Sequence, residues 1–254
     1  MGKKGKSSGL KRKPAPRFWH IHRKEFTWVV KPTSGPHSLE KCMPLSLVLR
    51  DTLGLAKTRR EAKTAVSQGK VYIDGSIRTQ DDFPVGLMDV ISIPDTGQNL
   101  RVLPSYKGLV FKEISSEEAK FKLCRIEDKT VVSNGQVQLH LHDGSTLQVK
   151  IADPKNPQED VYDTLDTVKI SLPEKQVLEQ IKMKEQSFAI ITGGKNIGKY
   201  GKAVEIEKAE GKKRRSALVT IEDKKGNRYQ TTLNFVFTIG ETQPLIALEE
   251  AVLG

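Results

Sequence analysis

Cysteine is scarce in this chain of 254 residues, and its scarcity argues against two classes of small domain. The two cysteines, Cys42 and Cys124, lie far apart and form no C-x-x-C pair. Zinc ribbons need such pairs, and disulfide scaffolds need more cysteines at closer spacing. We therefore expect both thiols to be reduced and structural.

Long hydrophobic runs are also missing. No run approaches the roughly twenty apolar residues that cross a bilayer. The lysines at positions 3, 4 and 6 are not followed by the apolar stretch of a signal peptide. We expect a cytoplasmic protein with no membrane partner. A hydrophobic content of 37% and a mean hydropathy of -0.45 still allow a core, divided among two or three small units.

Acidic residues are scarce only in the N-terminal part of the chain. Residues 1–42 hold eleven Lys or Arg against two Glu, whereas residues 43–104 hold eight against seven acidic residues. Residues 105–254 hold twenty-three basic against twenty-two acidic side chains. A near-neutral body with a cationic arm is typical of a protein that docks on nucleic acid or on an anionic membrane surface, and composition does not choose between them.

The basic N-terminal arm, residues 1–42, also contains aromatic side chains between its cations. In RNA-binding proteins cations neutralise phosphates, while aromatic or His faces stack on bases. Of Trp19 and Trp28, one is expected instead to pin the arm to the body, and the arm is expected to order only on binding. The candidate RNA-binding residues of the arm are Lys11, Arg12, Lys13, Arg17, Trp19, His20, His22, Arg23 and Lys24.

Residues 43–104 predict two helices and a hairpin. Pro44 begins an amphipathic segment that ends at Gly54. Thr58-Arg59-Arg60-Glu61 is a capping box, so a second helix begins near Arg59 and ends at Gly69. A strand at 71–73 then leads into the turn pair Asp74-Gly75.

The second helix carries three candidate phosphate contacts. Arg59 and Arg60 lie at its N-terminus, where free backbone N–H groups favour anions, and Lys63 follows one turn later. For Lys63 alone, a merely solvated helix face is an equally good interpretation. The stretch from Pro44 to Ile93 resembles the alpha-L motif, an RNA-binding module of ribosomal proteins, pseudouridine synthases and some tRNA synthetases.

Residues 105–184 predict a central antiparallel β domain. Val137, Leu139 and Leu141 alternate with polar residues, and a second alternating run follows the turn at 143–144. His140 and His142 are expected on the opposite face of the first strand. Because no third ligand is evident nearby, we expect no metal and no cofactor.

Residues 185–240 contain the pattern G-x-x-x-x-G-K at 193–199, which also occurs in nucleotide-binding loops. Here Tyr200 replaces the required Ser or Thr, and the next residues alternate like a strand. We therefore predict a glycine turn between two strands, with 217–221 and the run Leu233, Phe235 and Phe237 as further strands. The segment resembles the KOW module, an SH3-like barrel.

In the KOW family, the glycine turn and nearby basic residues face RNA or protein partners. That resemblance implies RNA contact by three lysines of this segment. A cationic hairpin tip at 211–215 adds candidate phosphate contacts. Together the candidates are Lys195, Lys199, Lys202, Lys212, Lys213, Arg214 and Arg215, and a tail of residues 241–254 follows the module.

Nearly the whole chain resembles the fourth e-type family of small-subunit ribosomal proteins, the S4e family of archaea and eukaryotes. The motifs that carry the resemblance are Leu10-Lys11-Arg12, Ala15-Pro16-Arg17, Lys31-Pro32, Gly35-Pro36-His37, Phe83-Pro84-Val85-Gly86-Leu87-Met88-Asp89-Val90, His142-Asp143-Gly144, Gly193-Gly194-Lys195-Asn196-Ile197-Gly198 and Asn234-Phe235-Val236-Phe237-Thr238-Ile239-Gly240.

The resemblance implies a non-catalytic ribosomal component. Its partners would be small-subunit rRNA and neighbouring small-subunit proteins, with no small-molecule substrate. The expected fold class is α+β, mostly β and multidomain. The short tail after Gly240 favours an archaeal member over a eukaryotic one.

Two other classes remain open. One is an RNA-modifying enzyme with an alpha-L module, such as a pseudouridine synthase, because Gly86-Leu87-Met88-Asp89 is similar to the G-R-L-D motif of its catalytic Asp. The roughly 80 residues between module and barrel are too few for a synthase domain. The other is a KOW transcription elongation factor, which the whole-chain resemblance disfavours.

Overall fold

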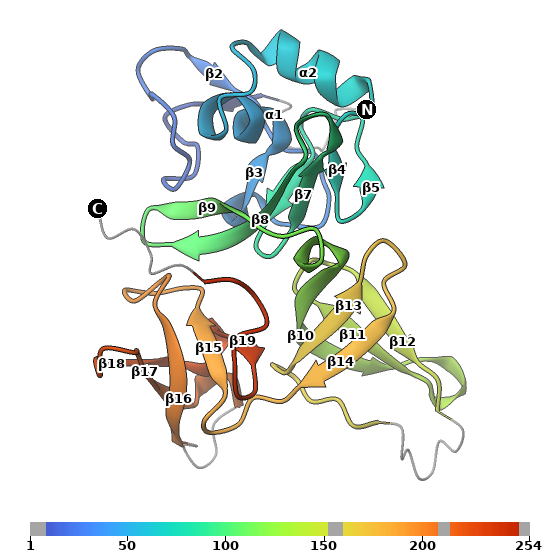
Figure 1. Ribbon diagram of the computed structural model, residues 1–254, viewed down its shortest axis with the longest axis vertical. Coiled ribbons are helices and arrows are strands. Elements are labelled where there is room, and N and C mark those ends of the chain that lie inside the picture. Colours follow the sequence, from blue (N-terminus) through green and yellow to red (C-terminus); the bar gives the residue numbers. More distant parts are fainter. Residues whose placement is uncertain (1–8, 152–159, 208–213, 249–254) are drawn as a thin grey trace, which may run out of the picture.

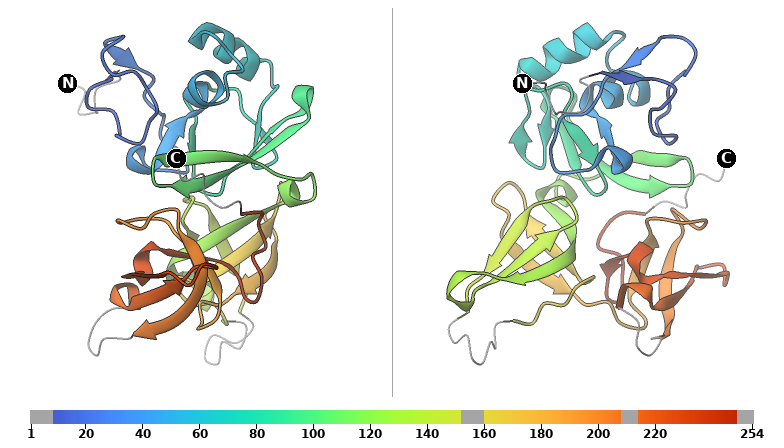
Figure 2. Two further views of the ribbon diagram at one scale, coloured as in Figure 1. Left: turned by 60° about the vertical axis from the view of Figure 1, so that its left-hand side comes forward. Right: turned by 180° about the vertical axis from the view of Figure 1, so that it is seen from behind.

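The chain forms three bodies of antiparallel sheet that meet at a common junction (Figures 1 and 2). The structure, a computed structural model, describes residues 9–151, 160–207 and 214–248. The first body extends from residue 9 to residue 113, the second covers 121–181, and the third covers 188–240. The expected mostly β fold with few helices is confirmed.

The helices of the first body follow the sequence prediction. Helix α1 (Leu45–Leu47) continues as a π-helical turn, Val48–Thr52, and Gly54 ends the segment with φ +66°. Helix α2 (Arg59–Ser67) begins at the predicted capping box. The backbone N–H of Glu61 donates to the Thr58 hydroxyl at 3.3 Å, and the Glu61 carboxylate accepts the Thr58 N–H at 3.4 Å. No helix in the described parts of the chain is both long and apolar enough to cross a membrane.

The strands of the first body form a two-stranded ribbon and a five-stranded sheet. The ribbon pairs β3 (Cys42–Pro44) with β6 (Pro84–Gly86). The predicted Asp74-Gly75 turn joins two strands of the sheet, with both residues at positive φ. In sheet order the strands are β5 (Ser76–Ile77), β4 (Tyr72–Ile73), β7 (Val90–Ile93), β8 (Gln98–Ser105) and β9 (Gly108–Glu113).

The chain continues in the same sheet across the domain boundary predicted at residue 104. Strand β8 continues to Ser105 and pairs with β9 as far as Glu113. The β8–β9 hairpin therefore belongs to the first body, and it lies between that body and the other two (Figure 1). The change in composition near residue 104 does not reveal this pairing across a turn.

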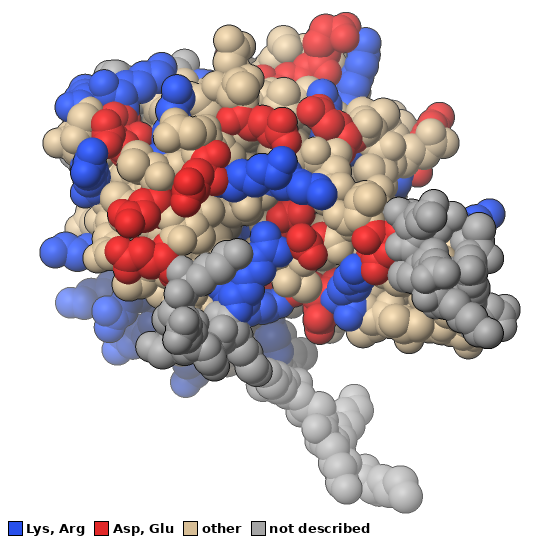
Figure 3. Space-filling model, turned by 90° about the horizontal axis from the view of Figure 1, so that it is seen from below, with Lys and Arg blue, Asp and Glu red and all other residues tan. Residues whose placement is uncertain are grey.

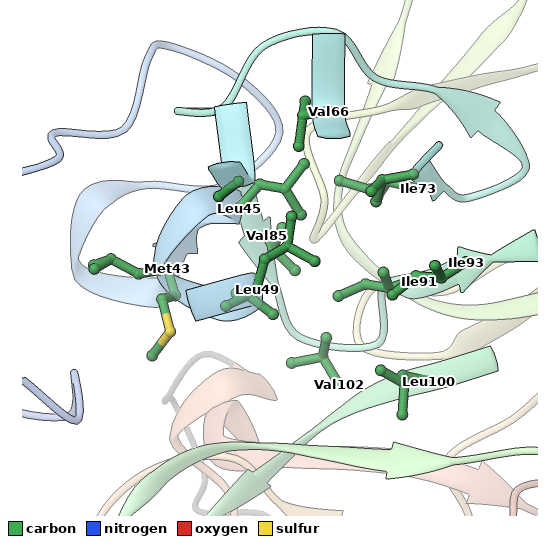
Figure 4. Packing of buried hydrophobic residues seen from close by; sticks show 14 of the residues in the cluster. Met43, Leu45, Leu49, Val66, Ile73, Val85, Ile91, Ile93, Leu100 and Val102 are labelled. Carbon is green, nitrogen blue, oxygen red and sulfur yellow. The ribbon is translucent and has the colours of Figure 1, made fainter. Parts of the chain in front are cut away.

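The core of the first body packs both helical segments on the sheet (Figure 4). Leu45 and Leu49 come from the first helical segment, Val66 comes from α2, and Ile73 and Ile91 come from the sheet. Each is at most 3% exposed. Burial of a side chain of this size contributes about 1.5–3 kcal/mol, so these contacts hold α2 in place on the sheet.

The N-terminal arm is folded against this core. Strand β1 (Leu10–Lys11) pairs with β2 (Trp28–Val29), and Ala15 and Trp19 are buried in the same cluster as α1. The Trp19 indole N–H donates to the Cys42 carbonyl at 2.8 Å. The expectation that the arm orders only on binding is therefore wrong for residues 9–41, because an apolar side chain and a hydrogen bond tie it to β3.

The second body contains the predicted hairpin. Val137, Leu139 and Leu141 are buried, and the return strand pairs with them in register. Cys124 is a free thiol in this core, and Cys42 is free and buried in the first body. Burial raises the pKa of the Cys42 thiol to about 12.

The second body is a five-stranded antiparallel sheet. In sheet order its strands are β12 (Thr146–Val149), β11 (Val137–Leu141), β10 (Phe121–Val131), β13 (Thr167–Ser171) and β14 (Val177–Ile181).

The third body has the predicted glycine turn between two strands, with β structure on both sides of residues 193–199. The prediction of a strand through Leu233, Phe235 and Phe237 is wrong. Leu233–Phe235 form a 3-10 turn, which leaves Phe235 half exposed, and the strand begins only at Val236. In sheet order the strands are β18 (Arg228–Thr232), β17 (Leu218–Glu222), β16 (Tyr200–Glu207), β15 (Phe188–Ile191) and β19 (Val236–Gly240).

An apolar cluster joins the three bodies. It takes Met88 from the first body, Leu123 from the second and Phe237 from the third, each at most 1% exposed. Ile246, from the segment after the last strand, is buried in the same cluster. Arg125 of β10 also reaches the third body, where its guanidinium donates to the carbonyls of Asn234 and Val236, both at 2.8 Å.

A buried ion cluster joins the first and second bodies. Lys122 of β10 is 1% exposed, and its Nζ lies 2.7 Å from Asp74, 2.6 Å from Asp89 and 3.1 Å from Asp143. His37 Nε2 lies 3.0 Å from each Asp89 carboxylate oxygen. Asp74 and Asp89 belong to the first body, whereas Lys122 and Asp143 belong to the second. The bodies are therefore held by charge as well as by apolar contact.

The pKa directions within this cluster follow from burial and charge together. Burial by itself would lower the pKa of Lys122, but the three carboxylates raise it well above its ordinary value. Burial would raise the pKa values of Asp89 and Asp143, yet the Lys122 charge holds both below their ordinary range. For Asp74, burial prevails and its pKa is raised. Lys122 thus keeps at least two buried carboxylates ionised.

Replacing Lys122 by Met should lower the free energy of unfolding by about 3–5 kcal/mol, because it leaves buried carboxylates without their cation. Lys120→Met is the matched control: this lysine lies two residues away, is exposed and pairs with the exposed Glu117. The control should cost less than about 1 kcal/mol. Urea unfolding followed by circular dichroism measures both, and equal losses in the two variants would contradict the role given to Lys122.

Candidate nucleic-acid interface

Exposed cations of the folded arm form one candidate surface. Lys11, Lys13, Arg17 and Lys24 are exposed, as are the side chains of His20 and His22. All lie on the loop and strands between residues 10 and 29, which the β1–β2 pairing holds against the first body (Figure 1). A surface that is already folded loses less conformational entropy when it meets an anion than a disordered arm would.

Arg12 and Trp19 are corrections to the predicted set, because both side chains are occupied inside the arm. Arg12 is 5% exposed, and its guanidinium donates to the carbonyls of His22 and Trp28. Trp19 is 2% exposed and pins the arm to the body. A phosphate or base cannot reach either side chain without opening the arm.

Arg23 is also engaged within the arm. Its guanidinium donates to four backbone carbonyls of the loop between β1 and β2, at distances from 2.9 to 3.0 Å; the acceptors are Arg12, Lys13, Ala15 and Pro16. The side chain is partly exposed, but these bonds use its donors to shape the loop. We therefore assign Arg23 to the support of Lys13 and Arg17.

Two exposed aromatic residues of the arm are absent from the predicted RNA-binding set. Trp28 is 59% exposed and Phe26 is 62% exposed, and the Lys11 ammonium lies 5.9 Å from the centre of the Trp28 ring. The Arg12 guanidinium lies 5.0 Å from the Phe26 ring. Alternation along β2, with Trp28 outward and Val29 inward, is the signal that could have identified Trp28 as the exposed tryptophan.

The N-terminus of α2 presents the predicted basic residues on the surface. Arg60 and Lys63 are exposed. Arg59 is exposed as well, but its Nε donates to Asp81 at 2.8 Å, so part of its charge is already neutralised. The unpaired N–H groups of the first turn add positive potential beside Arg60.

The basic residues of the third body divide into two groups. Lys195 is exposed in the glycine turn, while Lys199 and Lys202 lie over the rings of Tyr229 and Phe188 at 5.7 and 5.5 Å. These three remain on the surface near the glycine turn and the start of β16. Their stems cover aromatic rings, and the ammonium groups stay partly accessible.

Arg214 and Arg215, two of the expected phosphate contacts at the cationic hairpin tip, form ion pairs within the protein. Arg214 pairs with Asp166 at 3.1 Å, and Arg215 lies 3.6 Å from the Glu127 carboxylate. Both acids belong to the second body, so the two arginines connect the second and third bodies. Lys212 and Lys213 lie outside the described residues.

Three surface segments from distant parts of the chain converge at the junction. A side chain at Gly108 would come within 2.7 Å of the Phe18 carbonyl, so the tip of the β8–β9 hairpin touches the arm. A side chain at Gly198 would come within 3.0 Å of the Ser105 backbone, so the same tip touches the glycine turn. Tyr106, at that tip, is 81% exposed. The contacts bring Arg17, Lys107 and Lys195 to one region.

The face formed by the lower ends of the second and third bodies has a different character. Figure 3, seen from below, shows acidic and basic side chains intermixed over the nearer part of this face. Opposite charges at close spacing cancel at a distance, so this face attracts a polyanion less than the arm does.

The two histidines considered as metal ligands have separate surroundings. His140 contacts Thr130 at 3.0 Å. His142 does not project from the outer face as expected, because the strand ends at Leu141 and the ring turns into the junction. Its Nδ1 accepts from the Arg125 N–H and its Nε2 donates to the Leu87 carbonyl. Burial lowers the pKa of His142 to about 4, so it is neutral.

Comparison with known families gives three matches along the chain. The RS4NT (NUC023) domain matches residues 4–40, the S4 domain matches residues 43–91, and the Ribosomal family S4e matches residues 96–177. The first two ranges correspond to the arm and to the helical part of the first body. The third includes the β8–β9 hairpin and most of the second body.

Full-length relatives are similar over almost the whole chain. The small ribosomal subunit protein eS4 of Staphylothermus marinus is 51% identical over 98% of this chain and 99% of its own. The eS4 protein of Aeropyrum pernix is 48% identical over 98% of both chains. Among solved structures, the crystal structure of the 30S ribosomal protein S4e from Thermoplasma acidophilum matches with a TM-score of 0.65 and 30% identity, covering 80% of this chain and 96% of that one.

The two tryptophans should differ in solvent access in the RNA-free protein. In Trp28→Phe, the remaining Trp19 should resist acrylamide quenching and emit at shorter wavelength, because its indole is buried and hydrogen-bonded to Cys42. In Trp19→Phe, the remaining Trp28 should be quenched readily. Equal quenching of the two single-tryptophan proteins would contradict a folded arm.

Proposed function

The chain belongs to the S4e family of ribosomal proteins, and we propose on that basis that it is a structural constituent of the small ribosomal subunit. It binds small-subunit rRNA and supports subunit assembly and translation, in the cytoplasm and in contact with neighbouring small-subunit proteins. It is not an enzyme. The observation that carries this proposal is the 51% identity to an eS4 protein over nearly the full length of both chains. All the relatives named above are archaeal, as expected for this chain.

The same comparison with full-length relatives removes the support for an RNA-modifying enzyme. An RNA-modifying enzyme with an alpha-L module needs a catalytic domain, yet the full-length relatives leave no such domain in the chain. Asp89, the residue expected to be catalytic in that alternative, is 1% exposed and is paired with Lys122 and His37. Asp89 therefore connects two bodies and faces no substrate.

We propose that RNA contact is made mainly through backbone phosphates. The contributing side chains are those of the predicted set that remain on the surface and do not hold the arm together or join two bodies: Lys11, Lys13, Arg17, His20, His22, Lys24, Arg59, Arg60, Lys63, Lys195, Lys199 and Lys202. They come from three separate elements held in one rigid arrangement, so each added contact raises affinity without a further loss of freedom. Duplex RNA hides its base edges in a deep major groove, so backbone and shape supply most of this recognition.

We also propose that the third body is a KOW-type SH3-like barrel. Two features support this proposal. The strands are antiparallel in the order β18-β17-β16-β15-β19, and the glycine pattern at 193–199 forms a turn between two strands and not a phosphate-binding loop. Strand β16 follows that turn directly, so the backbone N–H groups there pair with other strands and no helix N-terminus is formed.

Co-sedimentation tests the ribosomal role directly. In a sucrose gradient of lysate from the source organism, the chain should travel with small subunits and remain there after a high-salt wash. Such retention is expected because many phosphate contacts act together. Recovery mainly in the soluble fractions at both salt concentrations would contradict the proposal.

The arm should dominate the salt dependence of RNA binding. Replacing Lys11, Lys13 and Arg17 together by Gln should reduce the slope of log K against log salt by about 2 to 3, because each lost phosphate contact removes roughly 0.7–0.9. Filter binding to small-subunit rRNA between low and moderate salt measures the slope.

A second triple variant provides the control for that measurement. Lys150, Lys184 and Lys224 are also exposed but lie in the second body, in the segment that follows it and in the third body, away from the arm. Their replacement by Gln removes the same net charge and should leave most of the slope intact. Equal reductions in the two triple variants would assign the effect to net charge rather than to the arm.

A further inference from the structure

A cavity of about 570 Å³ opens at the junction of the three bodies. Its apolar walls come from two bodies: Phe18 and Leu109 from the first, and Ile197, Phe235 and Phe237 from the third. The second body contributes Arg125, Glu127 and His142. Apolar walls with a small number of polar groups, at an interface between domains and in this range of volume, are typical of sites for small organic ligands.

Residues from five motifs of the family resemblance, none of them a proposed phosphate contact, meet at this cavity. His37, Leu87, His142, Gly193 and Asn234 each belong to a different motif of the family resemblance, and all five line it. Gly193 has a specific reason to lack a side chain, since a Cβ there would lie 2.5 Å from the Phe235 ring. The glycine allows that aromatic ring, 39% exposed, to lie flat against the turn.

Most polar groups around the cavity already have partners. His37 pairs with Asp89, His142 donates to Leu87, and Arg125 donates to backbone carbonyls of the third body. The Asn234 carbonyl accepts from Arg125, but its side-chain amide has no hydrogen-bond partner within the described residues. An amide offers one donor side and one acceptor side in a plane, which complements the hydrogen-bonding edge of a nucleobase.

The charged residues in the lining are of both signs, Glu40 and Glu127 beside Lys41, Arg125 and Arg215, and three further cations adjoin lining residues in the chain at the rim. Arg17 adjoins the lining residue Phe18, Lys107 adjoins Gly108, and Lys195 lies between Gly193 and Ile197. All three side chains are exposed, and no acidic partner for them is found among the described residues. Tyr106 stands beside Lys107 with 81% of its surface exposed. A matching ligand would have a flat, apolar group inside the cavity. It would carry negative charge on the part that emerges beside Arg17, Lys107 and Lys195.

We propose that the junction cavity binds one unpaired nucleobase of the bound RNA, with its ring against Phe235 and its edge on the Asn234 amide. The inference rests on the proposed function and names its substrate class more closely as RNA with an unpaired nucleotide. The flanking phosphates lie on the rim near Arg17, Lys107 and Lys195. Stacking of unpaired bases on aromatic side chains is the usual source of single-strand recognition in RNA-binding proteins.

Binding of two RNA probes to the full chain tests this site. The first is a fluorescein-labelled single strand of about 8 nucleotides of mixed sequence. The second is a perfect duplex of about 16 base pairs. Asn234→Ala and Phe235→Leu should each weaken single-strand binding about tenfold, because a stacked base contributes roughly 5- to 150-fold. Duplex affinity and the salt slope for either probe should stay within twofold of the parent protein.

Leu218→Ala is the matched control. Leu218 has the same exposed fraction as Phe235, 39%, and lies in the same body but away from the cavity. Its replacement should change neither affinity. Thermal unfolding separates binding from folding, and Asn234→Ala should keep the parent midpoint because its side-chain amide holds nothing else in place.

The outcomes distinguish this site from the wider function. Single-strand affinities within twofold of the parent in both cavity variants would overturn the base site, while co-sedimentation with small subunits would leave the ribosomal role intact. A parent protein that binds the duplex and not the single strand would overturn it as well. Failure to bind either probe, together with absence from the small-subunit fractions, would overturn the proposed function and the base site together.

Discussion

The arrangement of this protein depends on the buried charge of Lys122. One ammonium group contacts carboxylates from the Asp74 turn, from the start of β7 and from the Asp143 turn, so it fixes the first two bodies in position and orientation. Apolar contacts around Met88 and Phe237 supply attraction but tolerate sliding, whereas three charged hydrogen bonds tolerate little. Buried ions are costly unless fully paired, so the junction has one well-defined geometry.

That geometry matters because the surfaces proposed for RNA are composite. Arg17 comes from the arm, Lys107 from the β8–β9 hairpin and Lys195 from the glycine turn. None of these segments is long, and each by itself would bind a phosphate weakly. Held together by a rigid junction, they present several cations at fixed spacing to one polyanion, and the entropy of arranging them is lost during folding and not during binding.

The folded arm shows how a basic segment can serve two purposes. Arg12 and Arg23 turn inward, where they satisfy backbone carbonyls of a loop that has little regular structure. Trp19 anchors this loop to β3. Lys11, Lys13 and Arg17 then project outward from a shaped surface. The alternation of inward and outward cations means that the charge of the arm overstates the number of phosphates it can neutralise.

The sequence by itself determined the local elements, because capping boxes, glycine ends and alternating apolar residues act over a few neighbouring positions. The Thr58–Glu61 cap, the Asp74-Gly75 turn and the hairpin around Asp143 were all predictable in this way. Only the tertiary structure decided which cations are free, since Arg12, Arg214 and Arg215 find partners that are distant in sequence or hidden in a loop. The same holds for the ion cluster and the cavity. The cavity residues come from segments more than two hundred positions apart and meet only when three cores pack together.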